Sequence, residues 1–212
     1  METAGVKWGD NHQPRCFYEE TQGIRSQNEV VEGERWGDGM KEEKFILDAC
    51  CGPRMMWFNK KHPNAIYVDR RKEEKGFVPN RQDREVAPDI LMDFMDLKFP
   101  DKSFKLIAWD PPHLIRLGEK SIMAKTFGKL DAWTWESDIR KGFLEIWRVL
   151  DDYGVLVFKW CITDIPIRKV LRLFPERPLF GHTTGSKSQT RWMTFMKIPQ
   201  PPNNPQPGEK GE

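Results

Sequence analysis

The sequence predicts an α/β protein with an open, mostly parallel β-sheet. Short and continuous apolar runs alternate with helix-like or loop-like segments, and such runs are typical of strands buried on both faces. Acidic residues come at or just after the end of four of these runs. The chain then closes with two strand-like runs around a polar loop, which predicts a hairpin. Ligands of open α/β sheets bind at the carboxyl ends of the strands, so function is expected there.

Five buried strands are expected before the closing hairpin. They cover residues 45–48, 65–69, 89–92, 106–109 and 155–160. The hairpin is expected to join strands 179–182 and 191–197 through the polar loop 183–190.

Helices are expected at residues 54–61, 137–150 and 166–174. The second has the clearest pattern, because Ile139, Phe143, Ile146, Trp147 and Leu150 recur on one face at helical spacing. Ser137 can cap its start, and Gly154 follows its end. The segment 70–84 is expected to be a loop or one short turn, since Gly76 and Pro79 interrupt it.

The composition indicates one globular domain. A chain of 212 residues can bury a substantial core, and 38% hydrophobic with 31% charged residues is not the composition of a disordered protein. The formal net charge of +2 means that bulk electrostatics do not require a nucleic-acid partner. Residues 1–43 are expected to be a polar leader or cap, residues 44–198 the domain, and residues 199–212 a disordered Pro-rich tail.

The four cysteines show no zinc-type spacing, so no metal site is expected. Cys50 and Cys51 come at the end of a buried strand, which favours reduced, packed thiols in a cytoplasmic protein. The sequence contains no recognisable signal peptide and no apolar run long enough to cross a membrane, which also favours a cytoplasmic location.

The acidic residues at the strand ends predict a nucleotide-like ligand. Asp48 and Gly52 bracket the turn after the first strand, where glycine lets the backbone approach a ligand. Asp69 ends the second strand and can accept hydrogen bonds from ribose hydroxyls. Asp93 and Phe94 follow the third strand and offer an acceptor and a ring to an adenine. Asp110 ends the fourth strand and opens the motif Asp110-Pro111-Pro112-His113.

The stretch 44–197 resembles the class I S-adenosylmethionine-dependent methyltransferases, and most closely the Asp-Pro-Pro-aromatic amino-methyltransferases of DNA and RNA adenine. The resemblance implies a Rossmann-like, seven-stranded sheet with an antiparallel last strand, and S-adenosylmethionine as cofactor. It assigns the first cofactor motif to Asp48, Ala49, Cys50 and Gly52, the ribose contact to Asp69, the adenine contacts to Asp93 and Phe94, and catalysis to Asp110, Pro111, Pro112 and His113.

Two departures from the family pattern bear on the site. The usual Gly-x-Gly turn is reduced to Cys51-Gly52-Pro53-Arg54, and Arg54 is a hypothetical partner of the methionine carboxylate. His113 stands where the family has Tyr, Phe or Trp, and a histidine stacks on a base less well than an indole.

Basic residues predict where a substrate phosphate would bind. Arg116 and Lys120 follow the catalytic motif, and Lys187 and Arg191 belong to the closing hairpin. The chain has no room for a separate target-recognition domain. This favours loose sequence specificity, a structured RNA target, or a protein partner that supplies recognition of the DNA or RNA.

Three other interpretations remain open at this point. The protein could methylate a small molecule or a protein side chain, with His113 as general base. It could also be a cofactor-binding partner subunit without catalysis, as the missing second glycine suggests. A nicotinamide dehydrogenase is more remote, because its fingerprint has three glycines and this turn has one.

Overall fold

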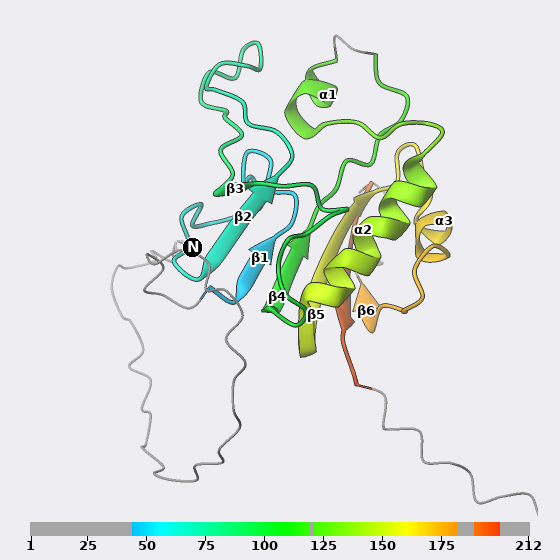
Figure 1. The fold of residues 1–212 in the computed structure, drawn as a ribbon. Coiled ribbons are helices and arrows are strands. Elements are labelled where there is room, and N and C mark those ends of the chain that lie inside the picture. Colours follow the sequence, from blue (N-terminus) through cyan, green and yellow to red (C-terminus); the bar gives the residue numbers. More distant parts are fainter. Residues whose placement is uncertain (1–43, 119–120, 182–188, 200–212) are drawn as a thin grey trace, which may run out of the picture. The chain divides into compact units, whose positions relative to one another are not determined.

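The computed structural model describes residues 44–118, 121–181 and 189–199, and this part of the chain forms one seven-stranded sheet (Figure 1). The strands are β1 (Ile46–Asp48), β2 (Ala65–Asp69), β3 (Ile90–Leu91), β4 (Phe104–Trp109), β5 (Leu150–Cys161), β6 (Phe180–Gly181) and β7 (Thr190–Met196). Their order is β3-β2-β1-β4-β5-β7-β6. The first five run parallel, and β7 is antiparallel to β5. This is the class I methyltransferase fold that the sequence predicts.

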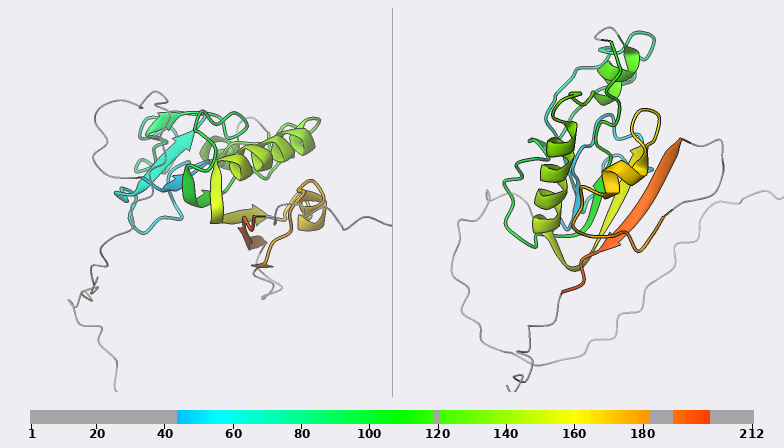
Figure 2. Two further views of the ribbon diagram at one scale, coloured as in Figure 1. Left: turned by 60° about the horizontal axis from the view of Figure 1, so that its bottom comes forward. Right: turned by 90° about the vertical axis from the view of Figure 1, so that its right-hand side faces the viewer.

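One face of the sheet carries the main hydrophobic core. Helix α2 (Trp135–Val149) and helix α3 (Ile167–Leu171) lie on this face (Figures 1 and 2). Ile139, Phe143 and Ile146 of α2 are fully buried, as the helical spacing predicts. Phe143 stacks on Phe174, which follows α3, with ring centroids 4.1 Å apart. Both helices therefore belong to the same core.

The opposite face of the sheet carries a second, smaller core. Side chains of neighbouring residues in a strand point to opposite faces, so Ile46, Ala65 and Tyr67 face away from α2. Trp57 packs against them from the segment between β1 and β2. A loop thus covers this part of the sheet where the sequence predicts a helix.

The helix expected at 54–61 is wrong, and backbone geometry explains why. The φ angles are +46° at Gly52 and +51° at Arg54, which belong to the left-handed region and do not start an α-helix. The Arg54 N–H instead donates to the Cys51 carbonyl at 2.8 Å and closes a turn. Segment 70–84 contains no helix, as expected.

Other boundaries shift by a few residues. The first residue of α2 is Trp135, with Thr134 as its N-cap, so the expected cap at Ser137 is wrong. Asp131 Oδ1 organises this start, since it accepts hydrogen bonds from the Trp133 and Thr134 N–H groups at 2.8 and 3.1 Å. Strand β5 begins at Leu150, directly after α2, and α3 has only five residues.

Helix α1 (Ile122–Phe127) is absent from the sequence-based assignment. It lies above the carboxyl ends of the parallel strands (Figure 1), in the segment that follows the Asp110-Pro111-Pro112-His113 motif. None of the helices among the described residues combines the length and the apolar character that crossing a membrane requires.

Candidate functional site

The carboxyl edge of the sheet gathers the acidic residues that the sequence singles out. Asp48 and Asp69 are the last residues of β1 and β2, and Asp110 directly follows β4. Asp93 comes two residues after the end of β3. Because these four strands are parallel neighbours, their carboxyl ends meet at one edge, below α1 in Figure 1. The arrangement suits a ligand that carries positive charge.

Asp48 is completely buried at this edge. Its Oδ2 accepts a hydrogen bond from Trp57 Nε1 at 2.6 Å, and its Oδ1 accepts one from the Cys50 N–H at 3.3 Å. The pKa of Asp48 is raised from 3.8 to about 7, and burial is the main cause. The two hydrogen bonds lower the pKa, whereas the charges of Asp110 and Asp69 add to its rise. Asp48 therefore titrates near neutral pH.

Asp69 links three segments. Its Oδ2 accepts from the Gly52 N–H and its Oδ1 from the Arg71 N–H, both at 2.9 Å. The Arg71 guanidinium lies 3.5 Å from Asp69 Oδ1 and donates to the carbonyls of Lys125 and Thr126 in α1, at 2.9 and 3.4 Å. A carboxylate has about four acceptor positions, so Asp69 keeps capacity for a ligand hydroxyl.

Phe94, which follows Asp93, lines a cavity of about 410 Å³ at the same edge. Asp93 Oδ1 accepts from the Met95 N–H at 2.9 Å. Phe94 packs edge-on against Trp109, with ring centroids 5.7 Å apart, and also lines the cavity. Pro112 of the predicted catalytic motif lines it too. The cavity thus joins a residue of the predicted adenine contact to one of the predicted catalytic motif.

Gly142 of α2 fixes how closely the helix approaches these rings. A Cβ atom there would lie 2.5 Å from Phe94 Cδ2 and 2.9 Å from Trp109 Cζ2. Both rings are buried, so neither can move away freely. We expect Gly142→Ala to lower the free energy of unfolding by about 1–2 kcal/mol, because overpacking outweighs the better helix propensity of alanine.

Urea denaturation followed by circular dichroism measures this change. Gly118→Ala is the matched control, since a Cβ at residue 118 would meet nothing within 4 Å. A Gly142→Ala protein as stable as the parent would show that the helix shifts without cost and that the contact does not constrain Phe94.

The Asp110-Pro111-Pro112-His113 motif is held rigidly. Asp110 Oδ2 forms an ion pair with Lys159 Nζ from β5. Pro111 and Pro112 are buried. His113 Nδ1 lies 3.4 Å from the Pro111 carbonyl, and its ring meets Trp160 edge-on at 6.1 Å. Burial lowers the pKa of His113 below its usual value, which keeps the imidazole neutral at neutral pH.

Ala49, Cys50 and Cys51 belong to the turn that follows β1, and their backbone N–H groups hold it in place. Ala49 is buried, and its N–H donates to the Ala108 carbonyl at 3.0 Å, while the Cys51 N–H donates to the Val68 carbonyl at 2.8 Å. These bonds fix the turn to the strands on both sides. Burial and the nearby charge of Asp69 raise the pKa of the Cys50 thiol well above its usual value, so Cys50 stays protonated.

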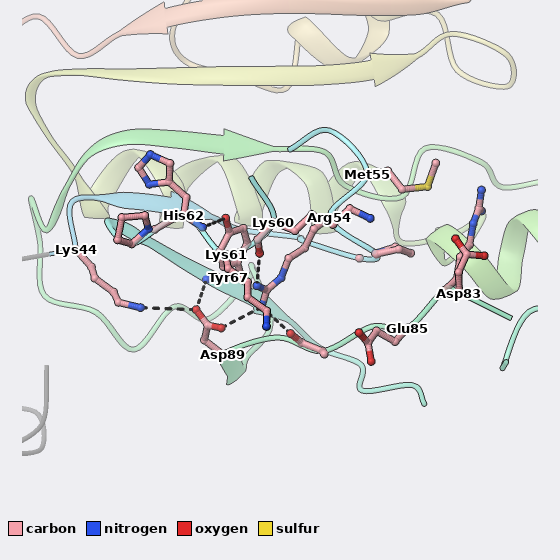
Figure 3. A pocket seen from close by; sticks show the side chains of 16 residues that line it. Lys44, Arg54, Met55, Lys60, Lys61, His62, Tyr67, Asp83, Glu85 and Asp89 are labelled. Atoms are coloured by element: carbon pink, nitrogen blue, oxygen red, sulfur yellow. Dashed lines mark hydrogen bonds and ion pairs between the residues drawn. The ribbon is translucent and has the colours of Figure 1, made fainter. Parts of the chain in front are cut away.

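Arg54 has a different environment from the acidic residues. It lines a larger cleft of about 830 Å³, where its guanidinium lies over the Tyr67 ring at 3.7 Å (Figure 3). It donates to the carbonyls of Lys60 and Ala87 at 2.7 and 2.6 Å and to Asp89 Oδ1 at 3.0 Å. The side chain therefore ties two loops together near the start of β3. This placement gives Arg54 a structural task, and its contact with the methionine carboxylate stays a prediction.

Of the four predicted substrate-binding residues, the structure describes Arg116 and Arg191. Arg116 is exposed, and its N–H donates to Asp164 Oδ2 at 3.0 Å. Arg191 pairs with Trp160 across β5 and β7 and donates through Nη1 to the Thr190 carbonyl at 3.1 Å. Lys120 and Lys187 lie outside the described residues.

Two side chains of the site were not expected from the sequence. Trp57 donates to Asp48 from a segment read as a helix, and Arg71 connects Asp69 to α1. Lys159 comes near the end of the predicted strand 155–160, where it could line the pocket or only finish the strand, and the structure places it on Asp110. A lysine inside the apolar run of β5 was the available signal, since a charge in a buried strand needs a partner.

Comparison with known proteins adds information on the fold. No protein-family model matches the chain, and the search of curated proteins gave no match. Solved structures with similar folds include an S-adenosylmethionine-dependent methyltransferase from Leishmania major, at 15% identity and a TM-score of 0.43, which aligns over 72% of this chain and 63% of its own. Another is the N-methyltransferase NodS from Bradyrhizobium japonicum, at 11% identity and a TM-score of 0.39, which aligns over 73% of this chain and 84% of its own. The chain thus spans less than two thirds of the Leishmania protein. These likenesses concern the fold, and the catalytic activity depends on the residues of the site.

Proposed function

We propose that the protein is an S-adenosylmethionine-dependent methyltransferase that modifies an exocyclic amino group of a nucleic-acid base, with adenine favoured. One observation carries the proposal. The Asp110 carboxylate is held by Lys159 and is followed by two consecutive prolines, which restrict the backbone. It lies at the sheet edge where Asp48 and Asp69 also lie. Methyl transfer from a cationic donor requires that the amine be held by a fixed hydrogen-bond acceptor, next to the site that binds the donor.

The residues at the edge fit the cofactor chemically. S-adenosylmethionine carries a positively charged sulfonium and an ammonium group. The carboxylates of Asp69 and Asp110 lie close enough to Asp48 to raise its pKa, so the three side chains form one acidic edge. Asp69 would hold the ribose, and Phe94 with the cavity of about 410 Å³ would hold the adenine. When bound, the cofactor supplies a methyl group activated by its positively charged sulfur.

The chain itself orients the acceptor amine. Lys159 occupies Asp110 Oδ2, which leaves Oδ1 to accept an N–H bond from the substrate, and the Pro111 carbonyl has a second lone pair beside its contact with His113. Two such bonds favour the tetrahedral form of the nitrogen, in which its lone pair is no longer delocalised into the ring. The proton that the amine gives up on methylation would pass to Asp110 or to water.

A labelling experiment tests this function. The protein is incubated with S-adenosylmethionine tritiated in the methyl group and, separately, with DNA, RNA, a metabolite extract and a protein extract. We expect label in nucleic acid as methylated adenine after digestion and chromatography. Label in metabolites or protein alone would replace the nucleic-acid substrate with the alternative below. Cofactor binding by calorimetry without transfer to any pool would indicate a non-catalytic partner subunit.

A small-molecule or protein methyltransferase is the second candidate, and the environment of His113 supports it. The ring is only partly buried and stays neutral, so it can accept a proton from an amine that must be deprotonated before attack. Under this alternative, His113→Gln would abolish transfer to the metabolite or protein pool. For a conjugated base amine, which attacks without prior deprotonation, the same variant would lose little.

A further inference from the structure

An exposed tryptophan lies close to the Asp110–Lys159 ion pair. Strands β5 and β7 run side by side (Figure 2). Their pairing places Trp192 directly opposite Lys159. The Lys159 Nζ atom lies 5.7 Å from the centroid of the Trp192 ring. The ammonium group that binds Asp110 is therefore also in cation–π range of this indole.

Trp192 and Lys159 share the face of the sheet that is opposite α3. Trp160 is fully buried and donates through Nε1 to the Ile165 carbonyl at 3.0 Å, so it points into the main core. Lys159 precedes it in the strand and must point the other way. The directly paired Trp192 points with Lys159, whereas the next residue, Met193, is buried. Trp192 thus stands beside the motif without belonging to the core.

The exposure of Trp192 needs a reason at this position. The residue is 39% exposed, and it lies on the face of β7 opposite the one that buries Met193 and Phe195 in the main core. Single exposed apolar side chains are common on protein surfaces, and Trp133 at 93% exposure is such a case. Trp192 differs because a lysine bonded to Asp110 adjoins its ring. An accessible indole face next to a fixed hydrogen-bond acceptor is a stacking surface for a planar ligand.

We propose that Trp192, Lys159 and Asp110 form a subsite for a flat nitrogen heterocycle that carries an exocyclic amine. The inference rests on the proposed methyltransferase function and specifies the residues that bind the base. The heterocycle stacks on Trp192, and its amine donates to Asp110 Oδ1. Lys159 has three N–H donors and uses one on Asp110, so a second can reach a ring nitrogen beside the amine. An aliphatic amine, as in a lysine side chain, gains nothing from the indole or from this donor.

Binding of a fluorescent base tests the subsite without any turnover. The probe is a single-stranded thymine oligonucleotide with one central 2-aminopurine, whose emission falls when the base stacks. S-adenosylhomocysteine is present throughout, so that no methyl group is transferred. We expect Trp192→Ala to weaken probe binding roughly tenfold, and Trp192→Phe to retain most of the affinity because a ring remains.

Trp133→Ala is the matched control, since it removes an equally large exposed indole that has no part in the subsite. Its affinity should equal that of the parent protein. Equal affinity of the Trp192→Ala protein would overturn the subsite, provided that its circular dichroism matches that of Trp192→Phe. Weakening by Trp133→Ala of the same size would reduce the effect to nonspecific stacking and would overturn it as well.

The outcome is separable from that of the labelling experiment. Label that enters nucleic acid with an unchanged KM in Trp192→Ala would support the function and reject the subsite. Quenching that depends on Trp192, with no label transferred to any pool, would support the subsite and reject the activity.

Discussion

Replacement of Asp110 by asparagine is expected to reduce methyl transfer by roughly 100-fold or more, while binding of S-adenosylhomocysteine stays unchanged. Asparagine has nearly the same shape, but it loses the ion pair with Lys159, so its side chain can rotate and present an N–H group to the substrate amine. A donor facing a donor repels the amine from the productive position. Rates are measured with tritiated cofactor on the acceptor pool that the labelling experiment identifies.

Lys159→Met tests, in the same experiment, how much the fixed orientation of the Asp110 carboxylate contributes to the rate apart from its charge. This variant keeps the Asp110 carboxylate but removes the group that holds it. Its rate should fall between those of the parent and of Asp110→Asn, because the acceptor persists in a less fixed position. Calorimetry with S-adenosylhomocysteine and urea denaturation establish that both variants fold and bind. A folded Asp110→Asn protein with the parental rate would contradict the catalytic role of the motif.

The strands were predictable because their signal is local. Residues 65–69 form β2 with the predicted bounds, since five consecutive buried residues leave little ambiguity. The convergence of Asp48, Asp69 and Asp110 follows from parallel topology alone, because parallel strands end at one edge. That part of the site could therefore be placed without knowledge of any contact.

Contacts between distant segments were not predictable. Segment 54–61 is predicted as a short helix. In the structure Trp57 donates to Asp48, and Arg54 donates to the carbonyls of Lys60 and Ala87, and these tertiary bonds override propensity. The pair of Asp110 and Lys159 spans 49 residues and exists because β4 and β5 are neighbours in register. Arg71 reaches α1 across more than 50 residues. The spacing of residues along the sequence does not show which distant residues pair. Asp110 was therefore predicted as a hydrogen-bond acceptor, whereas the contacts of Lys159 and Arg71 were not predicted.

Asp48 is expected to make the stability of the protein depend on pH in an unusual direction. Its pKa is about 7 in the folded protein and 3.8 as a reference for the unfolded chain, so between these values the folded state holds a proton that the unfolded state releases. The contribution of Asp48 to stability therefore falls as pH rises through this window. Carboxylates that are ion-paired in the folded state act in the opposite direction, because pairing with a cation lowers their pKa values.

Asp48→Asn removes the titration and keeps an oxygen for the Trp57 N–H. The unfolding free energy of the variant minus that of the parent should rise by about 3 kcal/mol between pH 4.5 and 7.5. Urea denaturation at one-unit pH intervals measures the difference, and the difference cancels the titration of groups that are not coupled to Asp48. Asp96→Asn is the matched control, because Asp96 is an exposed carboxylate bonded to Lys98, and its difference should stay nearly constant. A flat difference for Asp48→Asn would contradict the raised pKa of Asp48 and would mean that water or a counter-ion reaches this carboxylate in the folded protein.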